Sequence, residues 1–132
     1  MKTDKEVHYI YDPVFRTNFY YILATDQKEL LRVMKDRLNI TGKEKDHTEG
    51  RFLTAEKLGC MVGVIWTSNR NPWIIAHEVC HAVGWSLDCK GIPLTFETEE
   101  VYAYLTQYLY REIWEYLHKR FKNLSEPKEV AK

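Results

Sequence analysis

The sequence predicts an α+β fold in which a short, mostly antiparallel β-sheet packs against one apolar helix and a long C-terminal helix. Segments near the N-terminus are rich in Tyr, Ile, Val and Phe, which favour strands. Two later segments carry apolar residues at helical spacing over several turns. The chain has 132 residues, a length that suits a single core. We therefore expect residues 1–132 to form one domain.

The first half of the chain should supply the strands and one helix. Extended segments are expected at Val7–Phe15, Asn18–Thr25 and Cys60–Thr67. Asp26 is expected to cap a helix over Gln27–Leu38 that packs on the sheet. The Gly-containing, charged stretch Thr41–Arg51 is expected to be an exposed loop, with His47 a solvated bystander. Gly63 should mark a bulge or a close backbone approach.

Two helices are expected in the second half. Asn71 can cap a helix that has Pro72 at its first position and continues to about Leu87. Because this segment is almost entirely apolar, we expect it to be buried nearly all round. A Gly and a Pro then indicate a helix stop and a turn. The last helix should run from near Glu97 to about Phe121.

A His-Glu-x-x-His motif lies in the first of these helices, at residues 77–81. Four residues advance a helix by slightly more than one turn, so His77 and His81 share a face and Glu78 lies beside them. Two imidazoles at this spacing suit one Zn²⁺ ion, and a neighbouring carboxylate can act as a general base. Burying all three groups without partners would be costly, which favours a bound cation. The alternative is a pair of core histidines with a local ion pair.

Catalytic zinc usually takes three protein ligands, so the two histidines need a partner. Three acidic residues open the following helix, namely Glu97, Glu99 and Glu100. Eighteen residues separate His81 from Glu100, enough for the rest of one helix, a reversal and the first turn of the next. The same acids would also favour a helix N-terminus through its dipole. Cys80 and Asp88 are further ligand candidates, although the preferred interpretation of Cys80 is a small buried thiol.

The run HEVCHAVGWSLDCKGIPLTFETEEVYAYLTQYL resembles the zincin metallopeptidases, and within them the gluzincins, where a Glu on the next helix completes the zinc site. It is particularly similar to small phage- or prophage-encoded zincin-like proteins, which pair the motif with a Glu followed by a small residue and a Tyr. Glu100, Ala103 and Tyr104 match that pattern. The resemblance covers about residues 60 to 110. It implies a small zincin-like domain with Glu100 as the third ligand.

The resemblance also implies an activity, the hydrolysis of a peptide or protein substrate. In that mechanism Glu78 takes a proton from the metal-activated water and delivers it to the leaving amine. The substrate would add as a strand to Cys60–Thr67. Tyr104 or Tyr108 would stabilise the oxyanion, although Tyr at helical spacing also suits a core. The chain departs from the larger gluzincins in lacking a recognisable second domain.

The charge and the cysteine content limit the classes of partner and the compartment that we expect. Nineteen basic residues balance nineteen acidic ones, which argues against nucleic acid or an anionic membrane as partner. The charged N-terminus and the absence of a long apolar stretch predict a soluble, cytoplasmic protein. Three cysteines suit a reducing compartment.

Two other functions stay open on sequence grounds. One is a phage structural or assembly module that keeps zinc as a staple, and the other is a regulatory protein that binds a partner through the aromatic helix Tyr102–Tyr116. Glu78 favours the peptidase over the staple, because a structural site needs ligands but no base.

Overall fold

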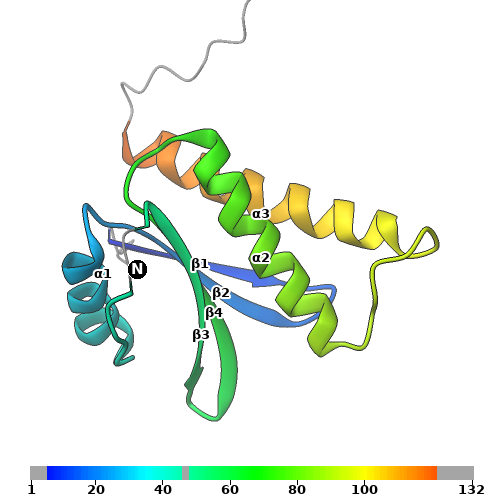
Figure 1. Cartoon of the computed structure of the whole chain (residues 1–132), viewed down its shortest axis with the longest axis horizontal. Helices are drawn as coiled ribbons and strands as arrows, with labels where there is room; N and C mark the ends of the chain where they lie inside the picture. The colour runs from blue at the N-terminus through cyan, green and yellow to red at the C-terminus, as the bar shows by residue number, and fades with distance from the viewer. Residues whose placement is uncertain (1–5, 46–47, 122–132) are drawn as a thin grey trace, which may run out of the picture.

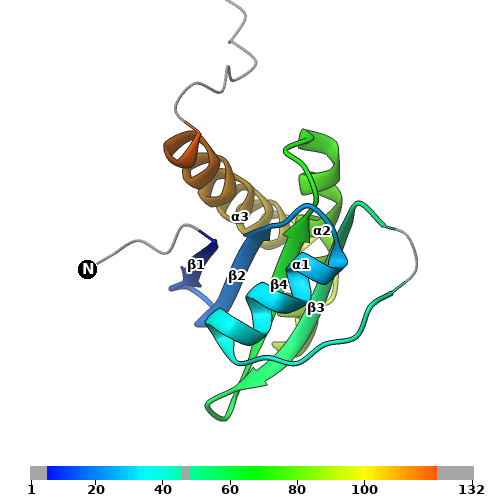
Figure 2. The same ribbon diagram turned by 90° about the vertical axis from the view of Figure 1, so that its left-hand side faces the viewer.

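The structure is a computed structural model that describes residues 6–45 and 48–121. The strands are β1 (Val7–Asp12), β2 (Thr17–Leu23), β3 (Gly50–Lys57) and β4 (Cys60–Thr67). The helical elements are α1 (Gln27–Val33), a π-helical turn η1 (Met34–Leu38), α2 (Pro72–Cys89) and α3 (Glu99–Arg120). Figure 1 and Figure 2 show α1 on one side of the sheet and the helices α2 and α3 on the other. The predicted α+β class and long C-terminal helix are confirmed. His47 lies outside the described residues.

The sheet has the strand order β1-β2-β4-β3. The outer pairs β1/β2 and β3/β4 are antiparallel and the central pair β2/β4 is parallel, so the sheet is mostly antiparallel as predicted. Alternate side chains serve two cores. Phe19, Tyr21 and Ile65 belong to the core under α2 and α3, whereas Ile22, Val64 and Trp66 belong to the core under α1.

The strand β3 is the element that the sequence analysis did not predict. It forms a hairpin with β4 through a two-residue turn at Leu58 and Gly59, whose φ angles are 53° and 83°. Positive φ at both turn residues matches the twist of the flanking strands. Gly59, placed directly before the apolar run of β4, was the local signal for this hairpin. The predicted loop therefore ends where β3 begins, at Gly50.

Gly63 marks a close backbone approach, as predicted. A Cβ atom there would lie 2.9 Å from Cε1 of Phe52 and 3.1 Å from Cδ1 of Phe19. Trp85 of α2 contacts both rings, with centroid separations of 5.6 Å to Phe52 and 6.0 Å to Phe19. This aromatic cluster holds the middle of α2 against the sheet.

The helix α2 begins as predicted, with the Asn71 side chain accepting a hydrogen bond from the Trp73 backbone N–H. Its burial is not as predicted. One face packs on the sheet and α3 through Ile75, Val79, Ala82, Val83 and Leu87. The opposite face is exposed and carries Trp73, His77, Cys80, His81 and Asp88. The prediction of all-round burial is wrong because β3, β4 and α3 cover only one side of this helix.

The helix α3 returns across α2 in the opposite direction. Figure 1 shows that it begins at the end of the molecule beyond the C-terminus of α2. Further along, the Tyr110 hydroxyl of α3 donates to the carbonyl of Pro72 at the start of α2, at 3.4 Å. The second half of α3 therefore lies beside the first turn of α2. Among the described residues, no helix is long and apolar enough to cross a membrane.

Candidate metal centre

His77 and His81 form a close pair on the exposed face of α2. Their Nε2 atoms lie 3.2 Å apart and their ring planes make an angle of 79°. Tetrahedral zinc with Zn–N bonds of about 2.0–2.1 Å needs nitrogen ligands about 3.3–3.4 Å apart. The pair thus fits two corners of a zinc site. A single N–H···N hydrogen bond between neutral imidazoles would also suit this distance.

Glu78 lies on the inner side of the same turn and is 6 % exposed. Burial raises the pKa of its carboxyl group, while His77, His81 and Lys45 act in the opposite direction. A carboxyl group with a raised pKa binds a proton more readily, which is what a general base requires. Glu78 thus lies next to the imidazole pair on the same helix turn.

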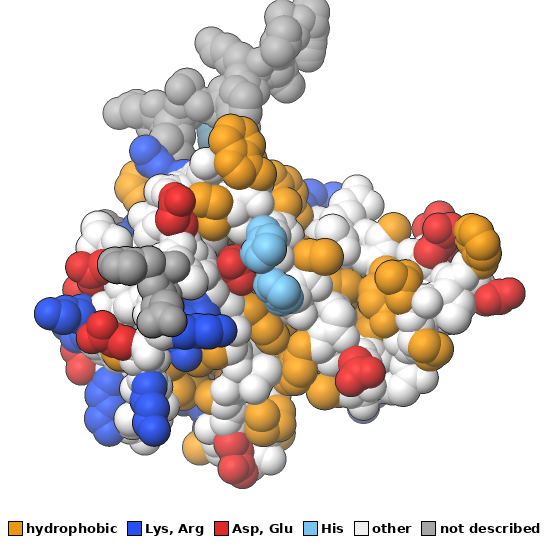
Figure 3. Space-filling view, viewed as in Figure 1, with side chains coloured by type: hydrophobic (Ala, Val, Ile, Leu, Met, Phe, Trp, Pro, Cys, Tyr) orange, Lys and Arg blue, Asp and Glu red, His pale blue; other side chains and the backbone are white. Residues whose placement is uncertain are grey.

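A shallow pocket of about 350 Å³ opens between the start of β3 and the first turns of α2. Its lining includes Gly50, Trp73, Ile74, His77 and Glu78. A small group entering from solvent can therefore reach one imidazole and the carboxyl group together. In Figure 3 the two imidazoles lie side by side on the surface over α2, with an acidic side chain next to them.

The structure does not bring Glu100 to the histidine pair. No group of three or more His, Cys, Asp or Glu residues among the described part of the chain is arranged to hold a metal ion. Glu97, Glu99 and Glu100 are exposed at the start of α3, and the acidic side chains of that region lie at the right-hand end of Figure 3, away from the imidazoles. The reason is the direction of α3, which begins beyond the far end of α2. Cys80 and Asp88 are exposed on α2 and do not complete a group either.

Tyr104 and Tyr108 lie away from the motif. Their rings stack at 6.0 Å, and the Tyr108 hydroxyl donates to the carbonyl of Tyr11 in β1 at 2.6 Å. Burial, and then the charge of Asp12 at the end of β1, raise the pKa of Tyr104. The strand β1 is one edge of the sheet, whereas Glu78 meets β3 at the other edge. The structure therefore does not support the predicted oxyanion role of Tyr104 or Tyr108.

The strand Cys60–Thr67 cannot take a substrate strand. It pairs with β2 on one side and with β3 on the other, so both of its edges are occupied. The edge strand next to the motif is β3. The expectation from the resemblance is corrected accordingly, and the cause is the unpredicted β3/β4 hairpin.

Gly50 is a site residue that sequence reasoning missed. It is 28 positions before Glu78, and no local pattern relates the two. Comparisons of the chain with models of protein families, with curated proteins and with solved structures found no match. The function of the protein is therefore inferred from the residues of this site.

Proposed function

We propose that this chain is a zinc-dependent peptidase, in which His77 and His81 hold the metal ion and Glu78 is the general base. The observation that supports the proposal most is the 3.2 Å separation of the two Nε2 atoms on the helix turn that also carries the buried carboxyl group. Zinc, nitrogen ligands and an adjacent carboxylate together constitute the chemistry of metal-assisted hydrolysis.

The residues of the chain would divide the work as follows. Bound zinc supplies a Lewis acid that polarises a carbonyl group and lowers the pKa of water. Glu78 accepts a proton from the attacking water and later gives it to the leaving amine. The close packing of Gly50 on its side chain limits the positions that this carboxyl group can take. A fixed base requires less reorganisation during the reaction.

The substrate would be a peptide in extended conformation along β3. An edge strand presents unpaired N–H and C=O groups that a peptide can complete as an added strand. Gly50, at the start of β3, is in contact with Glu78. A peptide added to this edge would therefore pass the carboxyl group and the imidazole pair.

The zinc-staple alternative has less support. Structural zinc is almost always held by four protein ligands in a closed site, whereas the histidine pair lies on an exposed helix face.

The partner-binding alternative is weakened because the aromatic side chains of α3 are used within the fold. The hydroxyl groups of Tyr102, Tyr108 and Tyr110 donate to backbone carbonyls, and Tyr116 is buried. Three unpaired, exposed cysteines suit the reducing compartment that we propose, the cytoplasm.

The decisive experiment measures zinc binding and hydrolysis in parallel. Metal-free protein should take up one zinc per chain in a titration, and His77→Ala or His81→Ala should lower that affinity by at least about a hundredfold. Cys89→Ala is the control, because Cys89 is exposed on the same helix and is not a candidate ligand. Cleavage of a peptide library should depend on zinc and disappear in both His variants. A parent protein that takes up no zinc would exclude the proposal.

A further inference from the structure

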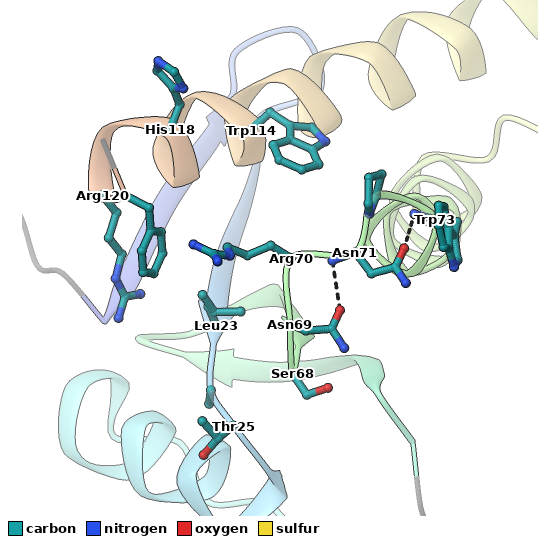
Figure 4. A pocket seen from close by; sticks show the side chains of 13 residues that line it. Leu23, Thr25, Ser68, Asn69, Arg70, Asn71, Trp73, Trp114, His118 and Arg120 are labelled. Atoms are coloured by element: carbon teal, nitrogen blue, oxygen red, sulfur yellow. Dashed lines mark hydrogen bonds between the residues drawn. The ribbon is translucent and has the colours of Figure 1, made fainter. Parts of the chain in front are cut away.

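A second and larger cavity, of about 1050 Å³, lies on the other side of Trp73 from the motif pocket. It is bounded by the end of β2, the segment between β4 and α2, and the last turns of α3 (Figure 4). Leu23, Trp73, Trp114 and Phe121 supply apolar surface, and Arg70 and Arg120 supply positive charge. The function proposed above uses neither arginine.

The two guanidinium groups lie over the same aromatic ring, that of Phe121. The central carbon of Arg70 lies 4.5 Å from the centre of the Phe121 ring, and that of Arg120 lies 5.2 Å from it. The two carbon atoms are therefore at most 9.7 Å apart, the sum of these distances. In Figure 4 the Arg70 side chain extends across the cavity toward the end of α3 that carries Arg120.

Neither guanidinium has a carboxylate partner within residues 6–45 and 48–121. Arg120 donates to the hydroxyl of Tyr116, and none of the described residues that line the cavity is Asp or Glu. By contrast, Arg32 contacts the carboxylates of Glu6, Glu29 and Asp36. Two cations that have no carboxylate partner in the described part of the chain lie beside one cavity, and their local field favours an anion.

The backbone of α2 does not supply the anion donors. The N–H of Trp73 bonds the Asn71 side chain, those of Ile74 and Ile75 bond the Asn71 carbonyl, and Pro72 has no N–H. The permanently charged donors among the described residues that line the cavity are the side chains of Arg70 and Arg120. Their planar, forked donors match the geometry of a carboxylate.

We propose that this cavity binds a carboxylate attached to an aromatic or large apolar group, as in the C-terminal residue of a peptide. The apolar group packs against Trp114 and Phe121 and the carboxylate bonds Arg70 and Arg120. Trp73 lines both this cavity and the pocket beside Glu78, so a peptide anchored here extends toward the motif. The identification of the ligand as a peptide rests on the proposed function, whereas binding of the carboxylate does not.

The test uses N-acetylphenylalanine and its amide, which differ only in charge at one end. Binding to the full, metal-free chain is followed by NMR of the indole N–H signals. Trp114 and Trp73 should shift, and Trp85, which packs against Phe19 and Phe52, is the internal reference. The acid should bind at least about tenfold more tightly than the amide, the effect expected for loss of one charge-assisted bond. Equal affinities, or no binding of the acid, would overturn the proposal.

Arginine variants test which side chains bind the carboxylate of the ligand. Arg70→Gln and Arg120→Gln should each lower the affinity for N-acetylphenylalanine by about tenfold and leave the affinity for its amide unchanged. Arg111→Gln on the exposed face of α3 is the charge-matched control. If an arginine variant fails to fold, the acid and amide comparison on the parent still decides. Tighter binding of phenyl phosphate than of the acid would replace the carboxylate assignment by a phosphate site. Because no step needs zinc or turnover, failure here is distinct from failure of the proposed peptidase.

Discussion

Gly50 and Glu78 are in contact across the junction of β3 and α2, so closely that a Cβ atom at position 50 would lie 2.9 Å from Oε2 of the carboxyl group. The Cγ2 atom of Ile74 would lie 3.0 Å from the same added Cβ atom. Glu78 is almost fully buried and lines the pocket beside the start of β3. The absence of a side chain at position 50 therefore defines where the proposed base lies.

Gly50→Ala should displace the Glu78 carboxyl group. We expect zinc affinity within about twofold of the parent and hydrolysis lowered by about tenfold or more, because a small misplacement of a base is costly. Overpacking should also lower the free energy of unfolding by about 1–3 kcal/mol. Gly84→Ala in α2 is the control, since nothing lies within 4 Å of a Cβ there. It should raise the free energy of unfolding by about 0.8–1 kcal/mol.

Glu78→Gln should retain zinc and lose hydrolysis, because the amide cannot accept the proton. The expected loss in kcat/KM is about a hundredfold or more. Glu115→Gln, an exposed change on α3, should leave both properties unaltered. Zinc titration and peptide cleavage on the same preparations check this, and a Gln variant that cleaves like the parent would remove Glu78 from the mechanism.

Glu100→Ala distinguishes the position of Glu100 in the structure from the ligand role that the family resemblance implies. If α3 begins where the structure has it, this change should leave zinc affinity within about twofold of the parent, because only a true ligand loses a coordination bond. Glu97→Ala and Glu99→Ala should behave alike. Chelator competition at one pH measures all three, since ligand protonation also changes affinity. A loss in Glu100→Ala comparable to that in His77→Ala would mean that metal binding draws the first turn of α3 to the pair.

His8 should make the protein less stable in acid. Burial lowers the pKa of its imidazole from an ordinary value of 6.5, and Glu112, whose Oε1 is 3.7 Å from Nε2, offsets only part of this. The unfolded chain then binds more protons than the folded one as pH falls below 6.5. The free energy of unfolding should therefore decrease with falling pH through the lowered pKa.

The variant His8→Phe isolates that contribution. It keeps a ring to stack on Tyr116, whose centroid lies 4.7 Å from that of His8, and it removes the titration. The parent should lose more stability than the variant between pH 6.5 and the lowered pKa. Denaturant unfolding at several pH values gives both curves, and parallel curves would show that His8 does not titrate in this way.

The sequence by itself determined the features that depend on neighbours along the chain. Asn71 and Pro72 begin α2 and Asp26 caps α1, because capping involves residues only two or three positions apart. The i, i+4 spacing put His77 and His81 on one face for the same reason. The limits of β4 followed from a run of β-branched and bulky residues.

Only the tertiary structure decided what these local elements meet. The β3/β4 hairpin made β3 the sheet edge, placed Gly50 against Glu78 and enclosed the strand Cys60–Thr67. The direction of α3 separated Glu100 from the histidines and left Arg70 and Arg120 beside one cavity. These relationships join residues tens of positions apart, and packing of whole helices and strands fixes them. The spacing of residues along the chain does not predict that packing.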